Sequence, residues 1–308
     1  MSPSASTPSA RPQKPLKPLK GLRILSLALN LPGPAALLRC RALGASCVKI
    51  EPPGPDTPGQ TKASGDPMAH YNPVVYAALH EGIRVQTANL KTPAGQKALH
   101  RALAKTDVLL TSFRPSALPK LGLDWRALHK QYPALSQVCI VGALGTRAEE
   151  PGHDLTYQAE HGLLPGLDLP ASLFADMGGA LQATEAVLQL ALLRHTGAPG
   201  AYLEVALADA AAYLALPRLW GLTAPGALLG GQHAGYRIYP CKDGRVAVAA
   251  LEPHFAAALC SVAGLAATSD MQARATHRAI TAFLAGKSRK QLEHIAIHND
   301  VPLHTLPK

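Results

Sequence analysis

The chain has 308 residues, of which 47% are hydrophobic and 16% are charged; this excludes both a minimal module and a disordered protein and leaves room for one or two domains. Thirty Lys and Arg residues against twenty Asp and Glu residues give a net charge of +10, which on its own suggests a nucleic-acid partner. Four of these charges lie in residues 1–20, where no acid occurs, and the remaining +6 suits an enzyme for an anionic small molecule. With 5% aromatic residues and no recognition motif, nucleic-acid binding is not expected.

The chain shows no sign of membrane insertion or secretion. It contains no run of about 20 uncharged apolar residues, so no membrane span is expected. Residues 1–18 are rich in Ser and Pro and lack a hydrophobic segment, which predicts a disordered basic tail and no secretory signal. The five scattered cysteines form no CxxC pair and are expected to be buried thiols of a cytoplasmic protein without a metal site.

Strand and helix patterns begin at the end of this tail. Residues 23–27 form a short apolar run, residues 35–43 read as a helix that ends at Gly44, and residues 47–50 form a second apolar run. Strand, helix and strand within about 30 residues predict a βαβ unit with two parallel strands. Residues 51–73 are rich in Gly, Pro, Asp and Thr and are expected to form a long loop.

The alternation then continues along the chain. Strands are expected at residues 84–90, 107–110 and 136–141, and helices at 92–105 and 125–131. This pattern predicts a Rossmann-like open parallel α/β sheet. Further on, the sequence predicts a long helix at 178–195, a strand at 202–205, a helix at 207–220, and a hairpin of residues 236–239 and 246–249 around Lys242-Asp243-Gly244. We therefore expect a large domain at residues 19–222 and a smaller α/β domain at 223–308.

Several short patterns are candidates for chemistry. The loop at residues 29–34 follows the first strand but lacks the GxGxxG spacing, so a dinucleotide cofactor is not expected. Asp176 stands just before the predicted long helix, where a carboxylate could act as a nucleophile or base, and two following glycines could let a substrate approach. His153 lies beside an Asp in a Gly-marked loop and could transfer a proton. Locally, the patterns also fit an ordinary helix cap at Asp176, a surface histidine at His153, and a cap at Glu252.

The motifs taken together resemble the opening and middle of the family III CoA-transferases, which include formyl-CoA transferase and α-methylacyl-CoA racemase. The resemblance covers residues 19–306 and rests on ordered segments at 19–27, 31–34, 43–45, 48–54, 89–95, 107–110, 113–115, 121–123, 151–155, 175–179, 195–197, 243–245 and 250–255. It implies an interlocked homodimer that binds CoA thioesters as substrates, without metal or nicotinamide. An acyl-CoA and a carboxylic acid are then the expected partners.

The resemblance also implies roles for single residues. Asp176 matches the aspartate that attacks the thioester in the transferases and forms a mixed anhydride. In the racemases, that position and the histidine matching His153 flank the α-carbon, and Glu252 matches an acid that supports the histidine. Arg114 matches an arginine that contacts a CoA phosphate. Arg84 and Lys49 are also expected to contact CoA.

The sequence departs from the family pattern in several places, among them Pro52 where some members have an Arg and the loop at residues 142–147. The basic Asn-Arg-Gly-Lys-Arg segment appears as His80-Glu81-Gly82-Ile83-Arg84, so Arg84 alone keeps a charge there. We also expect the C-terminal segment that returns to the large domain to be absent after Lys308. CoA transfer is the leading prediction, 2-methylacyl-CoA racemisation by His153 and Asp176 is the second, and a CoA-binding paralogue without turnover is the third.

Overall fold

A computed structural model of the chain describes residues 16–54, 64–164 and 166–308. Two compact units divide between Leu214 and Ala215. Most of the predicted N-terminal tail lies outside the described residues. Each unit is considered by itself below.

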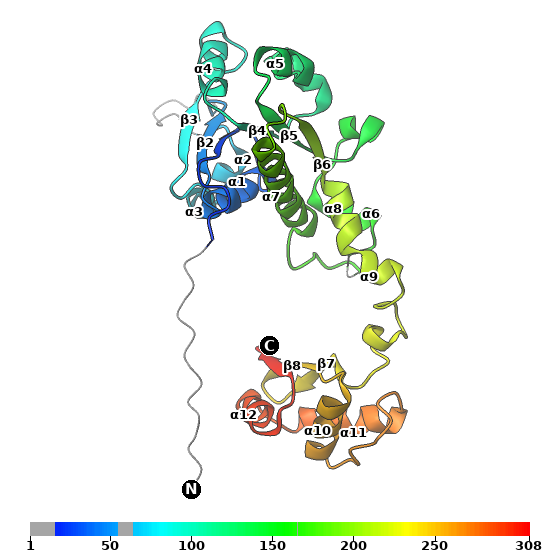
Figure 1. Ribbon diagram of the computed structural model, residues 1–308. Coiled ribbons are helices and arrows are strands. Elements are labelled where there is room, and N and C mark those ends of the chain that lie inside the picture. Colours follow the sequence, from blue (N-terminus) through cyan, green and yellow to red (C-terminus); the bar gives the residue numbers. More distant parts are fainter. Residues whose placement is uncertain (1–15, 55–63, 165) are drawn as a thin grey trace. The chain divides into compact units, whose positions relative to one another are not determined.

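The first unit is built on a parallel sheet. Within the described residues, its six strands follow the order β3-β2-β1-β4-β5-β6 (Figure 1). The strands are β1 (Arg23–Ser26), β2 (Ser46–Glu51), β3 (Arg84–Thr87), β4 (Val108–Thr111), β5 (Ser136–Val141) and β6 (Tyr202–Ala206). This order reverses between β1 and β4, as in doubly wound dinucleotide-binding folds. The predicted α/β fold with an open parallel sheet is confirmed.

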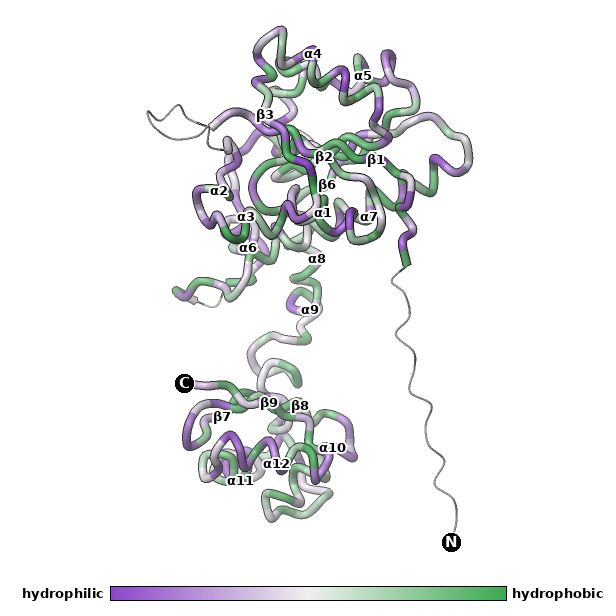
Figure 2. Tube along the Cα trace, turned by 90° about the vertical axis from the view of Figure 1, so that its left-hand side faces the viewer, coloured by the Kyte–Doolittle hydropathy of each residue, from purple (hydrophilic) through white to green (hydrophobic). Residues whose placement is uncertain are grey.

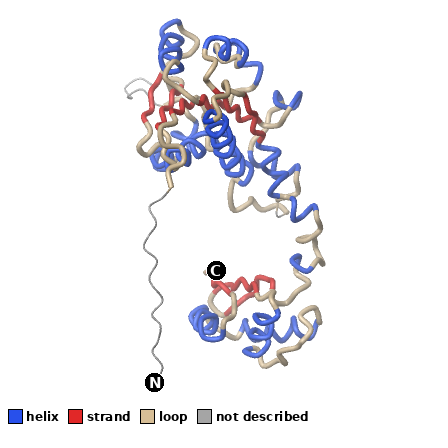
Figure 3. Tube along the Cα trace, viewed as in Figure 1, coloured by secondary structure: helices blue, strands red, loops and turns tan. Residues whose placement is uncertain are grey.

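Helices cover both faces of this sheet (Figure 2 and Figure 3). One face packs against α1 (Pro32–Ala42) and α7 (Phe174–His195), and the other packs against α4 (Pro93–Leu103) and α5 (Trp125–Gln131). The remaining elements of the unit are α2 (Pro67–Tyr71), α3 (Pro73–Leu79), α6 (Asp154–Glu160), α8 (Leu207–Leu214) and the 3₁₀ turns η1 (Pro115–Ala117), η2 (Pro119–Leu121) and η3 (Gly145–Glu149).

The central strands β4 and β5 form where the sequence has apolar runs. Every residue of β4 and of β5 is buried, because helices cover both faces. A strand buried on both faces cannot alternate apolar and polar residues, and for this reason the sequence revealed these strands as continuous runs.

Several element boundaries differ from the sequence prediction, and three of these bear on the site or on the division of the chain. Helix α1 begins at Pro32, before the expected residue 35, because prolines fit the first turn of a helix. Helix α7 begins at Phe174, before the expected residue 178, which places Asp176 inside its first turn. The helix expected at residues 207–220 is divided into α8 and α9 (Leu216–Leu219), with Pro217 in the first turn of α9.

One expected loop also contains helices. Residues 67–71 form α2 although the Gly- and Pro-rich segment 51–73 was expected to be a loop throughout. Asp66 caps this helix, because its carboxylate accepts a hydrogen bond from the backbone N–H of Met68 at 3.0 Å. The middle of the expected loop, residues 55–63, lies outside the described residues.

The second unit is a small α/β unit. The antiparallel strands β7 (Tyr236–Cys241), β8 (Gly244–Ala249) and β9 (Leu303–Leu306) pair in that order, which confirms the predicted hairpin. The helices of this unit are α9, α10 (Pro253–Val262), α11 (Arg274–Ala285) and α12 (Arg289–Asn299), with the 3₁₀ turn η4 (Leu228–Gly230). The last three helices share a core with the sheet, built around residues such as Val246, Ile280 and Leu292.

The cysteines behave as small apolar residues. All five are buried free thiols, as predicted. Burial raises the pKa of Cys40 and of Cys47 to about 12. Across residues 16–54, 64–164 and 166–308, the His, Cys, Asp and Glu side chains do not gather in groups of three that could hold a metal ion. None of the helices formed by the described residues has the length and apolarity that spanning a bilayer requires.

Candidate active site

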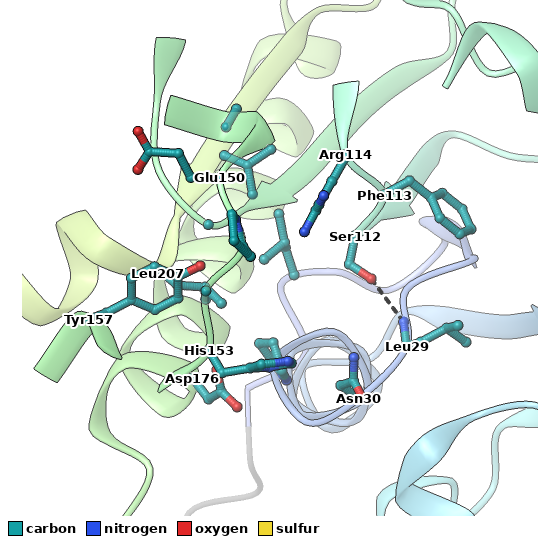
Figure 4. Close-up of a pocket in the computed structure, with 17 residues that line it drawn as sticks. Leu29, Asn30, Ser112, Phe113, Arg114, Glu150, His153, Tyr157, Asp176 and Leu207 are labelled. Atoms are coloured by element: carbon teal, nitrogen blue, oxygen red, sulfur yellow. Dashed lines mark hydrogen bonds between the residues drawn. The ribbon is translucent and has the colours of Figure 1, made fainter. Parts of the chain in front are cut away.

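A pocket of about 320 Å³ opens at the carboxyl ends of the central strands of the first unit. Its walls come from the segments that follow β1, β4 and β5, represented by Asn30, Arg114 and Gly142, and from the starts of α6 and α7. The pocket therefore lies where the strand order reverses, the usual place for a ligand in an open α/β sheet. Figure 4 shows Asn30, Arg114, His153 and Asp176 around this hollow.

Asp176 is a half-buried carboxylate that lines the pocket. It is the third residue of α7, and its backbone N–H donates a hydrogen bond of 3.0 Å to Oδ1 of Asp154. Asp154 is itself buried, and its other oxygen accepts a hydrogen bond from the side chain of Gln158. No ion pair of Asp176 occurs among the described residues. The loop before α6 thus fixes the backbone of Asp176, while its carboxylate faces the pocket.

This environment changes the acidity of Asp176. Burial, together with the nearby negative charge of Asp154, raises the pKa of Asp176 to about 7. Both causes outweigh the stabilisation that the N-terminus of α7 offers to a negative charge. A carboxyl group in a pocket with a pKa near neutrality is typical of groups that take part in catalysis.

His153 lines the same pocket from the residue that precedes α6. The hydroxyl of Thr156 accepts a hydrogen bond of 3.1 Å from the backbone N–H of His153 and donates one of 2.7 Å to its carbonyl. These bonds fix the backbone of His153 and leave its imidazole exposed at the pocket. The structure therefore brings together two of the three catalytic residues predicted from the sequence.

Two glycines make room for an aromatic wall of the pocket. A Cβ atom at Gly142 would lie 2.2 Å from the hydroxyl oxygen of Tyr157, and one at Gly152 would lie 2.4 Å from it. Both positions therefore need glycine for Tyr157 to keep its place. The glycine at position 179 also has a packing role, because a Cβ atom there would lie 2.3 Å from Leu207 of α8. Gly179 is buried and is not among the residues that line the pocket, so the expectation that it lets a substrate approach stays a prediction.

Arg114 is the predicted CoA contact that does line the pocket. It lies three residues after the end of β4 and is exposed, so its guanidinium can meet an anionic group from solvent. Arg84 begins β3 and instead lines a separate groove together with Arg101 and Lys105 of the α4 region. The structure therefore does not bring Arg84 to Asp176.

Lys49 is in a position that argues against its predicted contact with CoA. Its side chain is 0% exposed, and its ammonium forms ion pairs with Asp66 and, at 3.2 Å, with Glu51. An ammonium enclosed by carboxylates offers no charge to a phosphate at the surface. Lys49 is accordingly left out of the proposed CoA contacts.

Glu252 belongs to the second unit. It is exposed and immediately precedes α10. Its predicted support of His153 stays a prediction, because the two residues belong to different units.

Sequence reasoning missed three residues of the site. Asp154 was recognised only as the neighbour of His153, although its carboxylate holds the Asp176 backbone. Tyr157 follows on the next turn of α6, and this spacing of three from Asp154 could have indicated a shared face. Ser112 directly precedes the recognised Phe113-Arg114-Pro115 segment, and its hydroxyl accepts a hydrogen bond of 3.0 Å from the N–H of Leu29 (Figure 4).

The comparison with protein families identifies the class of protein to which this fold and pocket belong. Residues 19–307 match the model of CoA-transferase family III, so the chain belongs to that family. The resemblance inferred from the sequence motifs is thereby confirmed.

Known relatives include both transferases and a racemase. The chain is 34% identical over 206 residues to a CaiB/baiF CoA-transferase family protein of Caenorhabditis elegans, covering 60% of each chain. It is 28% identical to a succinate–glutarate CoA-transferase of Agrobacterium fabrum, covering 84% of this chain and 70% of the relative. It is 27% identical to human alpha-methylacyl-CoA racemase, covering 81% of this chain and 65% of the relative. The chain thus spans about two thirds or less of the length of some of these relatives.

A solved structure supports the fold. Rv3272 from Mycobacterium tuberculosis superposes with a TM-score of 0.77 at 24% identity, covering 94% of this chain and 84% of that one. At this identity, the match establishes the fold alone.

Proposed function

We propose that this protein transfers CoA from an acyl-CoA thioester to a carboxylic acid, with Asp176 as the nucleophile. The observation that carries the proposal is the position of Asp176, a pocket-facing carboxylate without a cationic partner among the described residues. The exposed Arg114 lines the same pocket. A volume of about 320 Å³ lies at the small end for ligand sites, which suits the acyl end of a thioester. The assignment of the chain to CoA-transferase family III supports the same chemistry.

The proposed reaction exchanges groups on Asp176 in balanced steps. A carboxylate oxygen of Asp176 attacks the thioester carbonyl carbon, the C–S bond breaks, and CoA leaves as a thiolate, so that a mixed anhydride remains. The thiolate then attacks the Asp176 carbonyl of this anhydride and releases the donor acid, which leaves an aspartyl-CoA thioester. The acceptor carboxylate displaces the thiolate to form a second anhydride. Attack of the thiolate on the acceptor carbonyl yields the new acyl-CoA and restores the Asp176 carboxylate.

The surroundings of Asp176 fit the demands of these steps. The attacking carboxylate must be ionised, and the pKa of about 7 makes it so above neutral pH. Its backbone is held by Asp154, which keeps the nucleophile in one position through successive attacks. We therefore expect the transfer rate to rise as the pH rises through about 7.

Replacing Arg114 tests how the pocket recognises CoA. We expect Arg114→Gln to raise KM for an acyl-CoA on the order of 10- to 100-fold, with a smaller change in kcat, because a charged hydrogen bond to a phosphate contributes about 1.5–3 kcal/mol. Arg101→Gln is the matched control, since Arg101 lies in the separate groove. Steady-state kinetics with succinyl-CoA as donor measures both constants. Equal KM values for the two variants would remove Arg114 from the proposed CoA site.

Racemisation of a 2-methylacyl-CoA is the second candidate. The specific observation in its favour is that His153 and Asp176 line one pocket, where two groups could exchange a proton with opposite faces of an α-carbon. A carboxyl group with a pKa of about 7 can both accept and donate a proton near neutral pH.

One experiment distinguishes these functions. The protein is incubated in D₂O with succinyl-CoA and ¹³C-labelled glutarate, and separately with (2R)-2-methylacyl-CoA, and the products are analysed by mass spectrometry. Labelled glutaryl-CoA supports the transferase. Deuterium at the α-carbon without CoA exchange supports the racemase and overturns CoA transfer. Bound CoA with neither product supports a CoA-binding paralogue without turnover.

Assembly is also a proposal. We infer a cytoplasmic homodimer, and the exposed apolar side chains of Tyr213, Leu219 and Trp220 support an interface with another chain. Light scattering of the purified protein measures the mass directly, and a monomer at micromolar concentration would contradict the proposed assembly.

A further inference from the structure

A cluster of buried polar side chains centred on Lys49 adjoins the wall of the pocket. Lys49 of β2 is fully buried, and so is Asp66, which precedes α2. The Lys49 ammonium is hydrogen-bonded to Asp66, lies 3.2 Å from Oε2 of Glu51, and lies 3.0 Å from Nε2 of His80. An ammonium has three N–H donors, and three acceptors surround this one, so its hydrogen-bonding capacity is used within the protein.

The partners of Lys49 are held in turn. Nδ1 of His80 lies 2.7 Å from the carbonyl oxygen of Tyr76 and can only donate there, which leaves Nε2 to accept from Lys49. Burial, and secondarily the charge of Lys49, lowers the pKa of His80, in agreement with this neutral form. The hydroxyl of Tyr76 bonds to both carboxylate oxygens of Glu51, at 3.0 and 3.1 Å. The cluster therefore ties β2 to α2 and α3 in one arrangement.

Asp66 connects this cluster to the pocket. One of its oxygens faces Lys49, while the other accepts hydrogen bonds from the backbone N–H groups of Asn30, at 3.1 Å, and Met68, at 3.0 Å. Asn30 lines the pocket and has a φ of 64°, a left-handed conformation that is uncommon for non-glycine residues and that asparagine adopts more readily than most. The preceding N–H, that of Leu29, is held by Ser112. Two successive N–H groups of this wall thus have side-chain acceptors.

We propose that Lys49 and Asp66 are positioning residues that hold the Asn30 wall of the pocket in the shape required for the acyl-CoA. Lys49 orients the Asp66 carboxylate, and Asp66 fixes the peptide of Asn30 in its left-handed conformation. The consequence for catalysis rests on the proposed function, whereas the consequence for the Asn30 peptide does not.

The test measures amide hydrogen exchange by mass spectrometry in the peptide that contains residues 27–36. We expect exchange to become at least tenfold faster in Asp66→Ala and in Lys49→Met, while the buried peptide of β5 stays protected in the same sample. The matched control is Asp107→Asn, which weakens the ion pair of Asp107 with Arg23 at the opposite end of β1. It removes a buried carboxylate without touching Asn30, so we expect unchanged exchange at residues 27–36.

A rescue variant distinguishes loss of the hydrogen bond to Asn30 from a general loosening of the fold. In the double variant Lys49→Met with Asp66→Asn, the amide oxygen can still accept from Asn30 and Met68 and no longer faces an ammonium. We expect the amides of residues 27–36 to exchange at least threefold more slowly in this variant than in a second double variant that combines Lys49→Met with Asp66→Ala. Equal exchange in the two double variants, or the same acceleration in Asp107→Asn, would overturn the proposal.

Kinetics then tests the catalytic consequence separately. We expect Asp66→Ala to raise KM for succinyl-CoA at least tenfold relative to Asp107→Asn. Faster exchange with unchanged KM would show that the wall is held by Asp66 but does not shape the acyl-CoA site. If no variant or wild type turns over any thioester, the exchange result still decides the positioning role, and only the proposed function fails.

Discussion

Asp176→Asn is expected to abolish CoA transfer and, at the same time, to make the folded protein more stable at pH 8. An amide cannot form the anhydride, so we expect kcat to fall at least about a thousandfold, as for other covalent nucleophiles. The gain in stability follows from the raised pKa of Asp176, because the fold holds this carboxylate in a place that disfavours its charge.

The direction of the pH dependence follows from proton linkage. The pKa of Asp176 is about 7 in the folded protein and 3.8 for an ordinary Asp, so the folded state binds the proton more tightly. The stability gained from that proton is fully present below about pH 4 and is lost as the pH rises through about 7. At pH 8, the ionised Asp176 therefore costs the fold at most about 4 kcal/mol, and water that reaches the pocket reduces this value.

Chemical unfolding at pH 4.5 and at pH 8 measures this effect. We expect Asp176→Asn to raise the free energy of unfolding by about 1–3 kcal/mol at pH 8 and by much less at pH 4.5. Asp168→Asn is the matched control, since Asp168 is exposed, and it is expected to change neither value by more than about 0.5 kcal/mol. An Asp176→Asn protein that is less stable than wild type at pH 8 would show that the carboxylate is not held at an energetic cost.

Lys49→Met is expected to give the largest loss of stability among these variants. Removing the ammonium leaves the carboxylates of Glu51 and Asp66 buried without their cation, and breaking a buried pair in this way costs about 3–5 kcal/mol. Neutral His80 cannot replace that charge, because its pKa is lowered by burial.

A double-mutant cycle measures the coupling of this pair. Urea unfolding at pH 7 is measured for Lys49→Met, Asp66→Asn and the double variant. We expect the double variant to lose less free energy of unfolding than the sum of the two single losses, by about 1–3 kcal/mol. Lys105→Met, at an exposed position, is expected to stay within about 0.5 kcal/mol of wild type. A loss below about 1 kcal/mol in Lys49→Met would contradict the enclosed ion pair.

The sequence predicted the large sheet because its central strands, β4 and β5, are buried on both faces. Continuous apolar runs, such as Val108–Thr111 and Ser136–Val141, are visible in a single sequence, and their alternation with helices determines the parallel order. The start of α7 was harder to predict, because Phe174 and Asp176 precede the glycines that looked like the boundary. Helix starts of this kind depend on tertiary contacts, here the hydrogen bond from Asp176 to Asp154.

The candidate site was predictable only in part from the sequence. His153 and Asp176 belong to short motifs that the family resemblance singled out, and the fold brings both to one pocket. The enclosure of Lys49 could not be predicted from the residues next to it in the sequence, because its partners Asp66 and His80 lie 17 and 31 residues further along the chain. The sequence predicted Lys49 as a contact of CoA, whereas folding encloses its side chain.

The most direct test of the central claim is to identify the atom that carries the acyl or CoA group during turnover. The protein is mixed separately with succinyl-CoA, acetyl-CoA and cinnamoyl-CoA, treated with hydroxylamine or borohydride, digested, and analysed by tandem mass spectrometry. The proposed mechanism predicts, with at least one donor, an aspartyl hydroxamate or a reduced side chain at Asp176, absent in Asp176→Asn and retained in Asp168→Asn. An unmodified Asp176 peptide with all three donors, or a modification at another residue, would contradict it.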